Sequence, residues 1–292
     1  MKYCKSIPGV LGFALTLIAA ATAADAPRLT FRFTTVNVPG ATQTIPGGVN
    51  NSGVMVGQYF DNSGAAHGYI LNGKKLTTLD DPNGTSSDAI SVNPNGSIAV
   101  AGSYINSTGK QEGFLYKRGK FTDVPGPTGA LVSSAFGIND KGEIVGFYED
   151  STRIVHGFLL KGKTYTTLDV PGATSTFAAG INGKGIIVLQ WLDSKGAMES
   201  SLYNGKTYRT IDVPGAAASY VQNINAAGDA IFGWMDSSGI AHGALLHGGK
   251  YYKFDDPKAV QTYPGGINDR HLIVGAYQVK SNGPYQGFKA TY

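Results

Sequence analysis

The sequence predicts an all-β fold, a six-bladed β-propeller with four antiparallel strands in each blade. Three observations favour this fold. Residue columns recur six times along the chain, each repeat holds short strand-like runs bounded by turn residues, and the two ends together supply one repeat. Of the 292 residues, 41 are Gly and only 15% are charged. Since about 25% is usual for charged residues, coiled coils and basic arms that bind nucleic acid are disfavoured.

The repeats rest on four columns of residues that keep the same spacing. Prolines stand 43, 43, 46, 43 and 43 residues apart, at Pro39, Pro82, Pro125, Pro171, Pro214 and Pro257. The same spacings separate the asparagines Asn50, Asn93, Asn139, Asn182, Asn225 and Asn268. A glycine follows three residues after each asparagine except the last, where His271 stands, and an aromatic column runs Tyr59, Tyr104, Tyr148, Trp191, Trp234, Tyr277. These columns define repeats at about 39–81, 82–124, 125–170, 171–213, 214–256 and 257–292.

The third repeat shows why the unit is a blade of strands. Runs rich in Val, Ile, Tyr, Phe and Thr alternate with Gly, Asn, Asp and Pro, which is typical of strands and turns. We expect strands at about 133–139, 143–148, 156–160 and 164–169, called a, b, c and d in order. The Asn139–Gly142 segment is the expected a–b hairpin turn, with Gly142 in the left-handed conformation.

The ends of the chain predict that the ring is closed. The chain finishes at 287–292 on a strand c with no strand d behind it. Leu29–Val38 matches strand d of the other repeats, so we expect it to complete the sixth blade. An open β-solenoid is the alternative arrangement of such repeats.

Residues 1–23 have the pattern of a secretory signal peptide. Lys2 and Lys5 precede an apolar run from Val10 to Ala21, and cleavage is expected after Ala23. The run is short for a membrane span, although a retained anchor is the alternative. We therefore expect a secreted protein, periplasmic or extracellular, with residues 24–292 forming a single monomeric propeller that has no membrane span. Cys4 is the only cysteine, so the mature chain is expected to hold no disulfide.

The repeated pattern also resembles a known family. Gly-Ile-Asn-x-x-Gly-x-Ile-Val-Gly is followed by His-Gly-Phe-Leu and by Thr-Thr-Leu-Asp-Val-Pro-Gly-Ala, best matched at 137–173. This combination resembles the HAF-repeat family of bacterial extracellular proteins over essentially the whole mature chain. The resemblance implies export and a propeller-like repeat fold, and it implies no established activity. The fourth repeat departs from the pattern, with Glu199-Ser200-Ser201 in place of His-Gly-Phe.

The titratable columns favour structural roles over metal or catalytic ones. The position at the start of strand c reads His67, Glu112, His156, Glu199, His242, Gln286. Equivalent positions on neighbouring blades lie too far apart for one zinc site, so we expect each residue to form a hydrogen bond within its own blade. The aspartates before Val-Pro or Pro are interpreted as turn residues, and the aromatic column as packing between blades. No metal or cofactor is predicted, because no HExxH, CxxC or GxSxG motif occurs.

The candidate site lies at the mouth of the central channel, where the d–a and b–c connections meet. The positions five before each repeated asparagine are Ile45, Asp88, Ser134, Phe177, Tyr220 and Tyr263. Phe177, Tyr220 and Tyr263 come from consecutive blades and form a predicted aromatic arc for a sugar ring, with Asp88 as the only carboxylate. The alternative is that these rings plug the channel. The preceding column, Thr44, Ser87, Ser133, Thr176, Ser219 and Thr262, is hydroxylated in every repeat and predicts a repeated hydrogen bond at a turn.

These features predict an exported, non-catalytic binding or scaffold module that binds a glycan or another extracellular ligand at the channel mouth. Nucleic acid is not an expected partner. The alternative is a secreted carbohydrate-active enzyme, a glycan lyase or hydrolase, on the same fold. A hydrolase would use two carboxylates roughly 5–10 Å apart.

Overall fold

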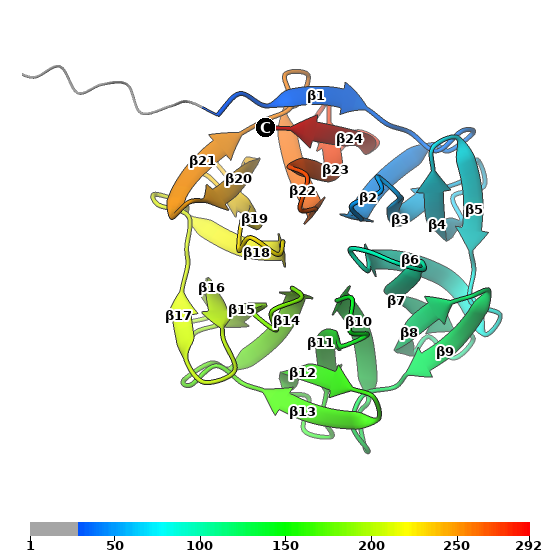
Figure 1. Cartoon of the computed structure of the whole chain (residues 1–292), viewed down its shortest axis with the longest axis vertical. Coiled ribbons are helices and arrows are strands. Elements are labelled where there is room, and N and C mark those ends of the chain that lie inside the picture. Colours follow the sequence, from blue (N-terminus) through cyan, green and yellow to red (C-terminus); the bar gives the residue numbers. More distant parts are fainter. Residues whose placement is uncertain (1–28) are drawn as a thin grey trace, which may run out of the picture. The chain divides into compact units, whose positions relative to one another are not determined.

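The computed structural model describes residues 29–292, and the predicted signal peptide lies outside this range. Residues Phe31–Tyr292 form one compact unit. Over the described residues the chain forms strands and turns without a helix, so it contains no helix that could cross a membrane. Six four-stranded antiparallel sheets are arranged in a ring (Figure 1), which confirms the predicted six-bladed β-propeller.

The strands follow the order a, b, c, d from the channel outward in each of the first five blades. Blade one consists of β2 (Gln43–Val49), β3 (Met55–Phe60), β4 (Ala66–Asn72) and β5 (Lys75–Leu79). Blade two consists of β6 (Gly84–Val92), β7 (Ala99–Asn106), β8 (Gln111–Lys117) and β9 (Lys120–Val124). Blade three consists of β10 (Val132–Ile138), β11 (Ile144–Glu149), β12 (Val155–Lys161) and β13 (Thr164–Leu168). Blade four consists of β14 (Ser175–Ile181), β15 (Ile187–Leu192), β16 (Met198–Tyr203) and β17 (Tyr208–Thr210). Blade five consists of β18 (Ala218–Ile224), β19 (Ala230–Met235), β20 (Ala241–His247) and β21 (Lys250–Phe254).

Blade six is assembled from both ends of the chain, as the sequence predicts. It consists of β22 (Gln261–Ile267), β23 (Leu272–Gln278), β24 (Gln286–Thr291) and, as its outer strand, β1 (Arg32–Thr35). The β1–β24 pair is antiparallel, with Arg32 opposite Thr291 and Thr35 opposite Phe288. The strand is shorter than the predicted 29–38, but Val36 N still donates to Gly287 O at 2.8 Å. Closing the ring in this way leaves no blade with an unpaired third strand.

The a–b turn has the predicted geometry. Gly142 has a φ of 74° and its N–H donates to Asn139 O at 3.0 Å. The Asn139 side chain holds the turn from inside, because its Oδ1 accepts the N–H groups of Lys141 and Glu143. His271, which stands in the glycine column of blade six, also adopts the left-handed conformation, with a φ of 60°.

The hydrophobic core lies between blades. One cluster joins Val56 and Leu79 of blade one to Val100 and Phe114 of blade two. The side chains of the hydroxyl column form hydrogen bonds with the d–a connections beside this core. In five blades the hydroxyl accepts the N–H of the residue six positions earlier, as Thr176 Oγ1 does from Val170 N at 3.2 Å. The predicted turn hydrogen bond is therefore confirmed for these blades. In blade three, Ser133 instead links Gly113 N to Val124 O.

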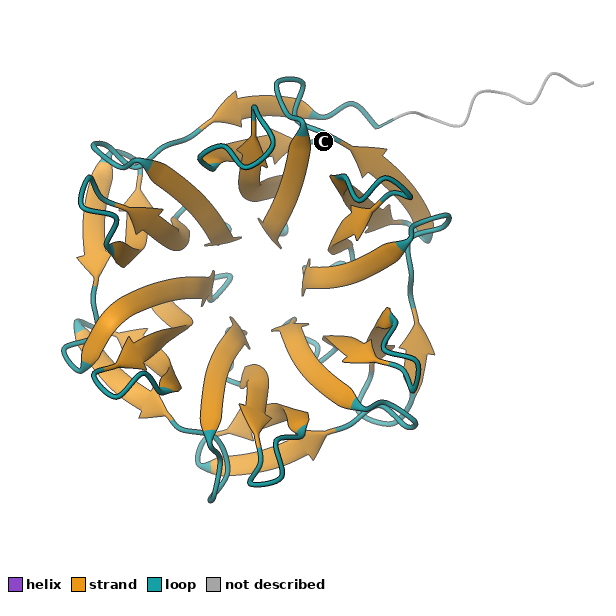
Figure 2. Ribbon diagram, turned by 180° about the vertical axis from the view of Figure 1, so that it is seen from behind, coloured by secondary structure: helices purple, strands orange, loops and turns teal. Residues whose placement is uncertain are grey.

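The two ends of the channel differ in what surrounds them. We call the side with the d–a and b–c connections the loop face, and the side with the a–b and c–d turns the turn face. The innermost strand of each blade approaches the axis most closely at its carboxyl end (Figure 2). The inner strands therefore converge toward the turn face and spread toward the loop face.

Candidate functional site

The six predicted mouth positions lie on the inner strands, next to the buried hydroxyl column. Five of them, Ile45, Asp88, Phe177, Tyr220 and Tyr263, are half-buried, and Ser134 is fully buried. Successive side chains of a strand point to opposite sides, so a buried hydroxyl is followed by a more exposed residue. The structure thus places the predicted residues at equivalent positions of the ring. Their role in binding stays a prediction.

Tyr220 and Tyr263 belong to one aromatic group with a third member, Tyr285. Tyr285 comes from the b–c connection of blade six, and its ring meets the ring of Tyr263 edge to face at 5.5 Å. Burial raises the pKa of Tyr220, with Tyr285 adding to the rise. Burial raises the pKa of Tyr263 to about 12, with Tyr285 and Tyr220 contributing. The ring contact places Tyr285 against Tyr263, and the electrostatic effect on pKa associates Tyr220 with both.

Phe177 packs against other residues than Tyr220 and Tyr263, with which the sequence predicts it to form an arc. Its ring packs edge to face on Phe147 of blade three at 5.2 Å, and Phe147 packs in the same way on Phe136. The predicted arc therefore divides into a tyrosine group in blades five and six and a phenylalanine group in blades three and four. Sequence reasoning missed Phe147 and Tyr285, because neither lies on an innermost strand.

Asp88 lies among polar groups of blades one to three. Burial raises the pKa of Asp88 to about 6. The Tyr69 hydroxyl is fully buried, and its pKa is raised by burial and then by the charge of Asp88. Neither Tyr69 Oη nor Ser134 Oγ has a hydrogen-bond partner among the residues that the structure describes. Both side chains are fully buried, so Asp88, which is half-buried, is the polar group of this side that a ligand in the channel can reach.

A β-bulge in every innermost strand shapes the middle of the channel. The register of β10 and β11, for example, shifts between Ala135 and Gly137, so Phe136 is the extra residue. The extra residues of the six blades are Gly47, Ile90, Phe136, Ala179, Gln222 and Gly265. All six line a cavity of about 110 Å³, together with Gln190 and Asn223. The bulges thus bring one residue of each blade to this cavity, a side chain in four blades and a glycine in blades one and six, and the sequence columns do not reveal this.

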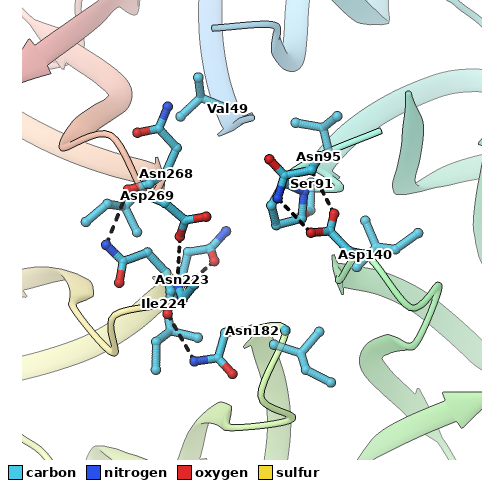
Figure 3. A pocket seen from close by; sticks show the side chains of 17 residues that line it. Val49, Ser91, Asn95, Asp140, Asn182, Asn223, Ile224, Asn268 and Asp269 are labelled. Carbon is cyan, nitrogen blue, oxygen red and sulfur yellow. Dashed lines mark hydrogen bonds between the residues drawn. The ribbon is translucent and has the colours of Figure 1, made fainter. Parts of the chain in front are cut away.

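The repeated asparagines form a belt of hydrogen bonds at the narrow end of the channel, and Figure 3 shows two of them, Asn182 and Asn268, beside the cavity there. Each of four Nδ2 groups donates to the backbone carbonyl of the asparagine in the next blade. These links run from Asn139 to Asn182, Asn182 to Asn225, Asn225 to Asn268 and Asn268 to Asn50, at 2.8–3.3 Å. The asparagines were predicted as turn residues. The structure shows that they also tie neighbouring blades together.

Two further links complete the belt where that pattern stops. Pro94 changes the turn of blade two, and the Asn93 side chain there donates to Asn95 O instead of to the next blade. Asn51 reaches Asn95 Oδ1 at 2.9 Å, and Asn95 in turn donates to Asp140 through its backbone N and its Nδ2, at 2.7 and 2.8 Å. The belt surrounds a cavity of about 80 Å³. Its polar groups already bond to one another, so we assign it to the architecture.

The histidine column forms hydrogen bonds within each blade, as predicted. His156 Nδ1 lies 3.0 Å from Asp169, its Nε2 lies 3.3 Å from Asp150, and Tyr148 stacks on its ring. His67 and His242 have equivalent aspartate partners in blades one and five. The interpretation of the Asp-Val-Pro aspartate as a turn residue is therefore corrected, because its carboxylate binds strand c. No group of three residues suited to a metal occurs within 29–292.

The loop-face aspartates do not converge on the channel. Asp61 begins the b–c connection of blade one, and hydrogen bonds from Ser63 and Ala65 lower its pKa to about 2. Asp150 is held in the same way in blade three, by Thr152 and Ile154. Each carboxylate is engaged in its own turn, where it bonds to nearby backbone N–H groups. Asp88 stays the only carboxylate among the six mouth positions.

Blades two and four have a glutamate where blades one, three and five have histidine. The pKa of this glutamate is shifted in opposite directions in the two blades. Glu112 in blade two lies 2.7 Å from Lys110 Nζ and accepts from Tyr104 Oη at 2.8 Å. Its pKa is lowered, chiefly by Lys110. Glu199 in blade four shares a hydrogen bond with Asp212, and this contact, together with burial, raises the pKa of Glu199 to about 7. Blade four therefore holds a carboxyl–carboxylate pair with no lysine in the place of Lys110.

Comparison with known proteins adds support for the fold. No family model matches the chain, and no curated protein sequence matches it. Among solved structures, the SapL1 lectin in complex with alpha methyl fucoside aligns with a TM-score of 0.56 and 10% identity, over 86% of this chain and 94% of that one. TolB from Acinetobacter baumannii aligns with a TM-score of 0.59 and 11% identity, over 81% of this chain and 63% of that one.

The β-propeller domain of the Trilobed protease from Pyrococcus furiosus is a third similar structure. It aligns with a TM-score of 0.54 and 10% identity, over 85% of this chain and 81% of that one. At these identities the likeness concerns the fold alone. The protein is thus a six-bladed β-propeller, and its function has to be argued from its own residues.

Proposed function

We propose that this protein is an exported carbohydrate-binding propeller whose ligand sits at the channel mouth on the loop face. The observation that carries the proposal is the half-buried tyrosine group Tyr220, Tyr263 and Tyr285. Tyrosine offers an apolar ring on which a sugar can stack and a hydroxyl that bonds to sugar oxygens. Export and the resemblance to the HAF-repeat family are part of this proposal.

Exposed apolar side chains support the choice of face. The large hydrophobic residues with the greatest exposure are Ile154, Met235, Ile240, Val260 and Val279, at 46%, 38%, 40%, 42% and 51%. All five lie in loop-face connections or at the strand end beside one, and four belong to blades five and six, as the tyrosines do. Apolar groups exposed beside aromatic rings are a common feature of binding surfaces.

A polar group on another part of the mouth supports a hydroxylated ligand. Asp88 is half-buried on the innermost strand of blade two and supplies a carboxylate whose pKa burial raises to about 6. Sugars combine apolar faces with hydroxyl groups, so they match a site of this composition. The SapL1 lectin, a propeller of similar fold, is described with a bound fucoside, which is consistent with a saccharide as the ligand class.

The alternative of a glycan lyase or hydrolase has less support. A hydrolase needs a pair of carboxylates at roughly 5–10 Å, and Asp88 stands alone among the six mouth positions. Glu199 lies on β16, the third strand of its blade, and Asp212 lies in the d–a connection after β17, where it accepts a hydrogen bond from Ser219 Oγ, so neither carboxyl group belongs to the six mouth positions.

A glycan array on the purified protein, followed by calorimetry with the best ligand, tests the proposal. Tyr220→Ala should weaken binding by roughly 1–3 kcal/mol, as expected for an aromatic anchor. Tyr252→Ala, on outer strand β21 of the same blade, is the matched control and should leave affinity unchanged.

Several outcomes would overturn the proposal. These are no glycan bound, equal losses in the two variants, or breakdown of the bound glycan. If the rings only fill the channel, Tyr220→Ala should instead cost about 3–5 kcal/mol of stability, with no ligand found.

A further inference from the structure

Charge is divided unevenly between the two faces of the propeller. The turn-face connections and the strand residues directly flanking them carry thirteen lysines and arginines against four carboxylates. The corresponding residues of the loop face carry five against eleven. The modest overall net charge therefore conceals a strongly basic turn face.

The four turn-face carboxylates are already engaged within the chain. Glu143 pairs with Lys161 at 2.9 Å and Asp229 with His247 at 2.9 Å. Asp140 and Asp269 accept hydrogen bonds in the asparagine belt. These interactions partly neutralise the four carboxylates, so most of the positive charge on this face stays available to an external partner.

A groove between blades one and two concentrates this charge. It has a volume of about 310 Å³, within the range of small-molecule pockets. Ile70, Ile98 and Tyr116 supply its apolar lining, and Asn72, Thr77 and Ser97 supply amide and hydroxyl groups. Lys75 and Arg118, both exposed, supply the charge, and the lining contains no carboxylate.

Arg118 holds an unusual backbone conformation at this groove. Its φ is 52°, in the left-handed region that disfavours side chains with a Cβ. The corresponding c–d turn position is glycine in the other blades that have this turn, at Gly73, Gly162, Gly205 and Gly248. The chain thus places a long cationic side chain where glycine would be easier. The exception places the Arg118 side chain in the lining of the groove that also contains Lys75.

We propose that this groove, together with the surrounding basic turn face, binds an acidic polysaccharide. The carboxylate or sulfate group of one sugar unit would lie between Arg118 and Lys75, because a guanidinium pairs with such groups in a two-pronged geometry. The ring of that unit would pack on Tyr116, and its hydroxyls would bond to Asn72, Thr77 and Ser97. Neighbouring acidic units would follow the lysines of the adjacent turns.

The turn face fits a polar polymer better than a lipid surface. Among the described residues, every large hydrophobic side chain with high exposure lies on the loop face and none on the turn face. A protein that inserts into a membrane surface needs apolar side chains on its contacting side. A sugar polymer with regularly spaced anions needs only cations, hydroxyl partners and a shallow groove.

Arg118→Gly provides a sharp test because it should not harm folding. The variant restores the residue that other blades have at this turn, so thermal stability should stay the same or rise. Binding to polygalacturonate oligomers, measured by calorimetry at low salt, should fall at least tenfold. Lys163→Ala removes one positive charge from the c–d turn of blade three, outside the groove, and should change affinity less than twofold.

Three further measurements distinguish this site from a neutral-glycan site, from a lipid-binding surface and from the channel-mouth site. A neutral glucan oligomer and vesicles of anionic phospholipid should bind at least tenfold more weakly than polygalacturonate. Tyr220→Ala should leave polygalacturonate binding unchanged, so the channel-mouth proposal and this one fail independently. Equal losses for Arg118→Gly and Lys163→Ala, preference for the vesicles, or no binding of polygalacturonate would each overturn the proposal.

Discussion

The carboxyl–carboxylate pair of blade four should make the stability of the whole propeller depend on pH. The hydrogen bond to Asp212, together with burial, raises the pKa of Glu199 from its ordinary value of 4.5 to about 7. A raised pKa means that ionisation opposes folding. The favourable contribution is complete below pH 4.5 and is lost as the pH rises through 7. Glu199→Gln should remove this loss, since glutamine donates to Asp212 without acquiring charge.

The size of the effect follows from the two pKa values. The difference between 4.5 and about 7 corresponds to an upper bound of about 3 kcal/mol, at about 1.36 kcal/mol per pKa unit. Glu199 is half-buried, and solvent screening at such a site reduces this to about 1–2 kcal/mol. At pH 8 we therefore expect Glu199→Gln to unfold about 2–8 °C higher than the unaltered protein, and at pH 4 at the same temperature.

Thermal and urea unfolding between pH 4 and pH 8.5 measure this difference, and Glu112→Gln is the matched control. In blade two, Lys110 and Tyr104 stabilise the ionised carboxylate. The control should therefore be slightly destabilised above pH 4.5, and this loss should disappear as the pH falls through the lowered pKa of Glu112, the opposite of Glu199→Gln. If the free energy of unfolding of Glu199→Gln ran parallel to that of the unaltered protein across the whole range, the reasoning would be refuted.

Three other perturbations have defined outcomes. Asp88→Asn should stabilise the protein by about 1–2 kcal/mol at pH 8 and have no effect below pH 3.8, because burial raises the pKa of Asp88 to about 6. Unfolding of both proteins at the two pH values tests the sign of the difference in stability. Gly142→Val should destabilise by about 1–3 kcal/mol through strain at a φ of 74°, and unchanged unfolding in urea would contradict it. Deleting residues 24–38 should cost several kcal/mol because β24 loses its partner strand, and a melting temperature equal to that of the full chain would show that β1 does not close the ring.

The fold could be predicted from the sequence because the same turn residues recur in every repeat. The asparagine, glycine and proline columns each occupy a turn, and turns are set by local backbone chemistry that recurs in every blade. The strand boundaries of blade three were therefore predicted to within one residue, and the pairing of β1 with β24 followed from the phase of the two ends.

Contacts between repeats could not be read from the same columns. The asparagine belt depends on how far each blade is rotated against the next, and the bulge depends on a register shift that leaves no mark in a column of identical residues. Tyr285 joins Tyr263 through a connection found only in blade six. The sequence therefore predicts which positions of the ring form the candidate site. The structure is needed to show which residues contact one another there.

The asparagine belt has unequal joints, and this bears on how the ring opens. The four direct asparagine links, from blade three round to blade one, are buried hydrogen bonds. The side-chain links that replace them, from Asn51 to Asn95 and from Asn95 to Asp140, are exposed. Water competes for exposed hydrogen bonds, so they resist separation less. The joint between blades one and two also has a backbone hydrogen bond, from Asn51 N to Pro94 O at 3.0 Å, so the ring should separate first between blades two and three. A polymer bound across the groove between blades one and two would strengthen the other joint of blade two further.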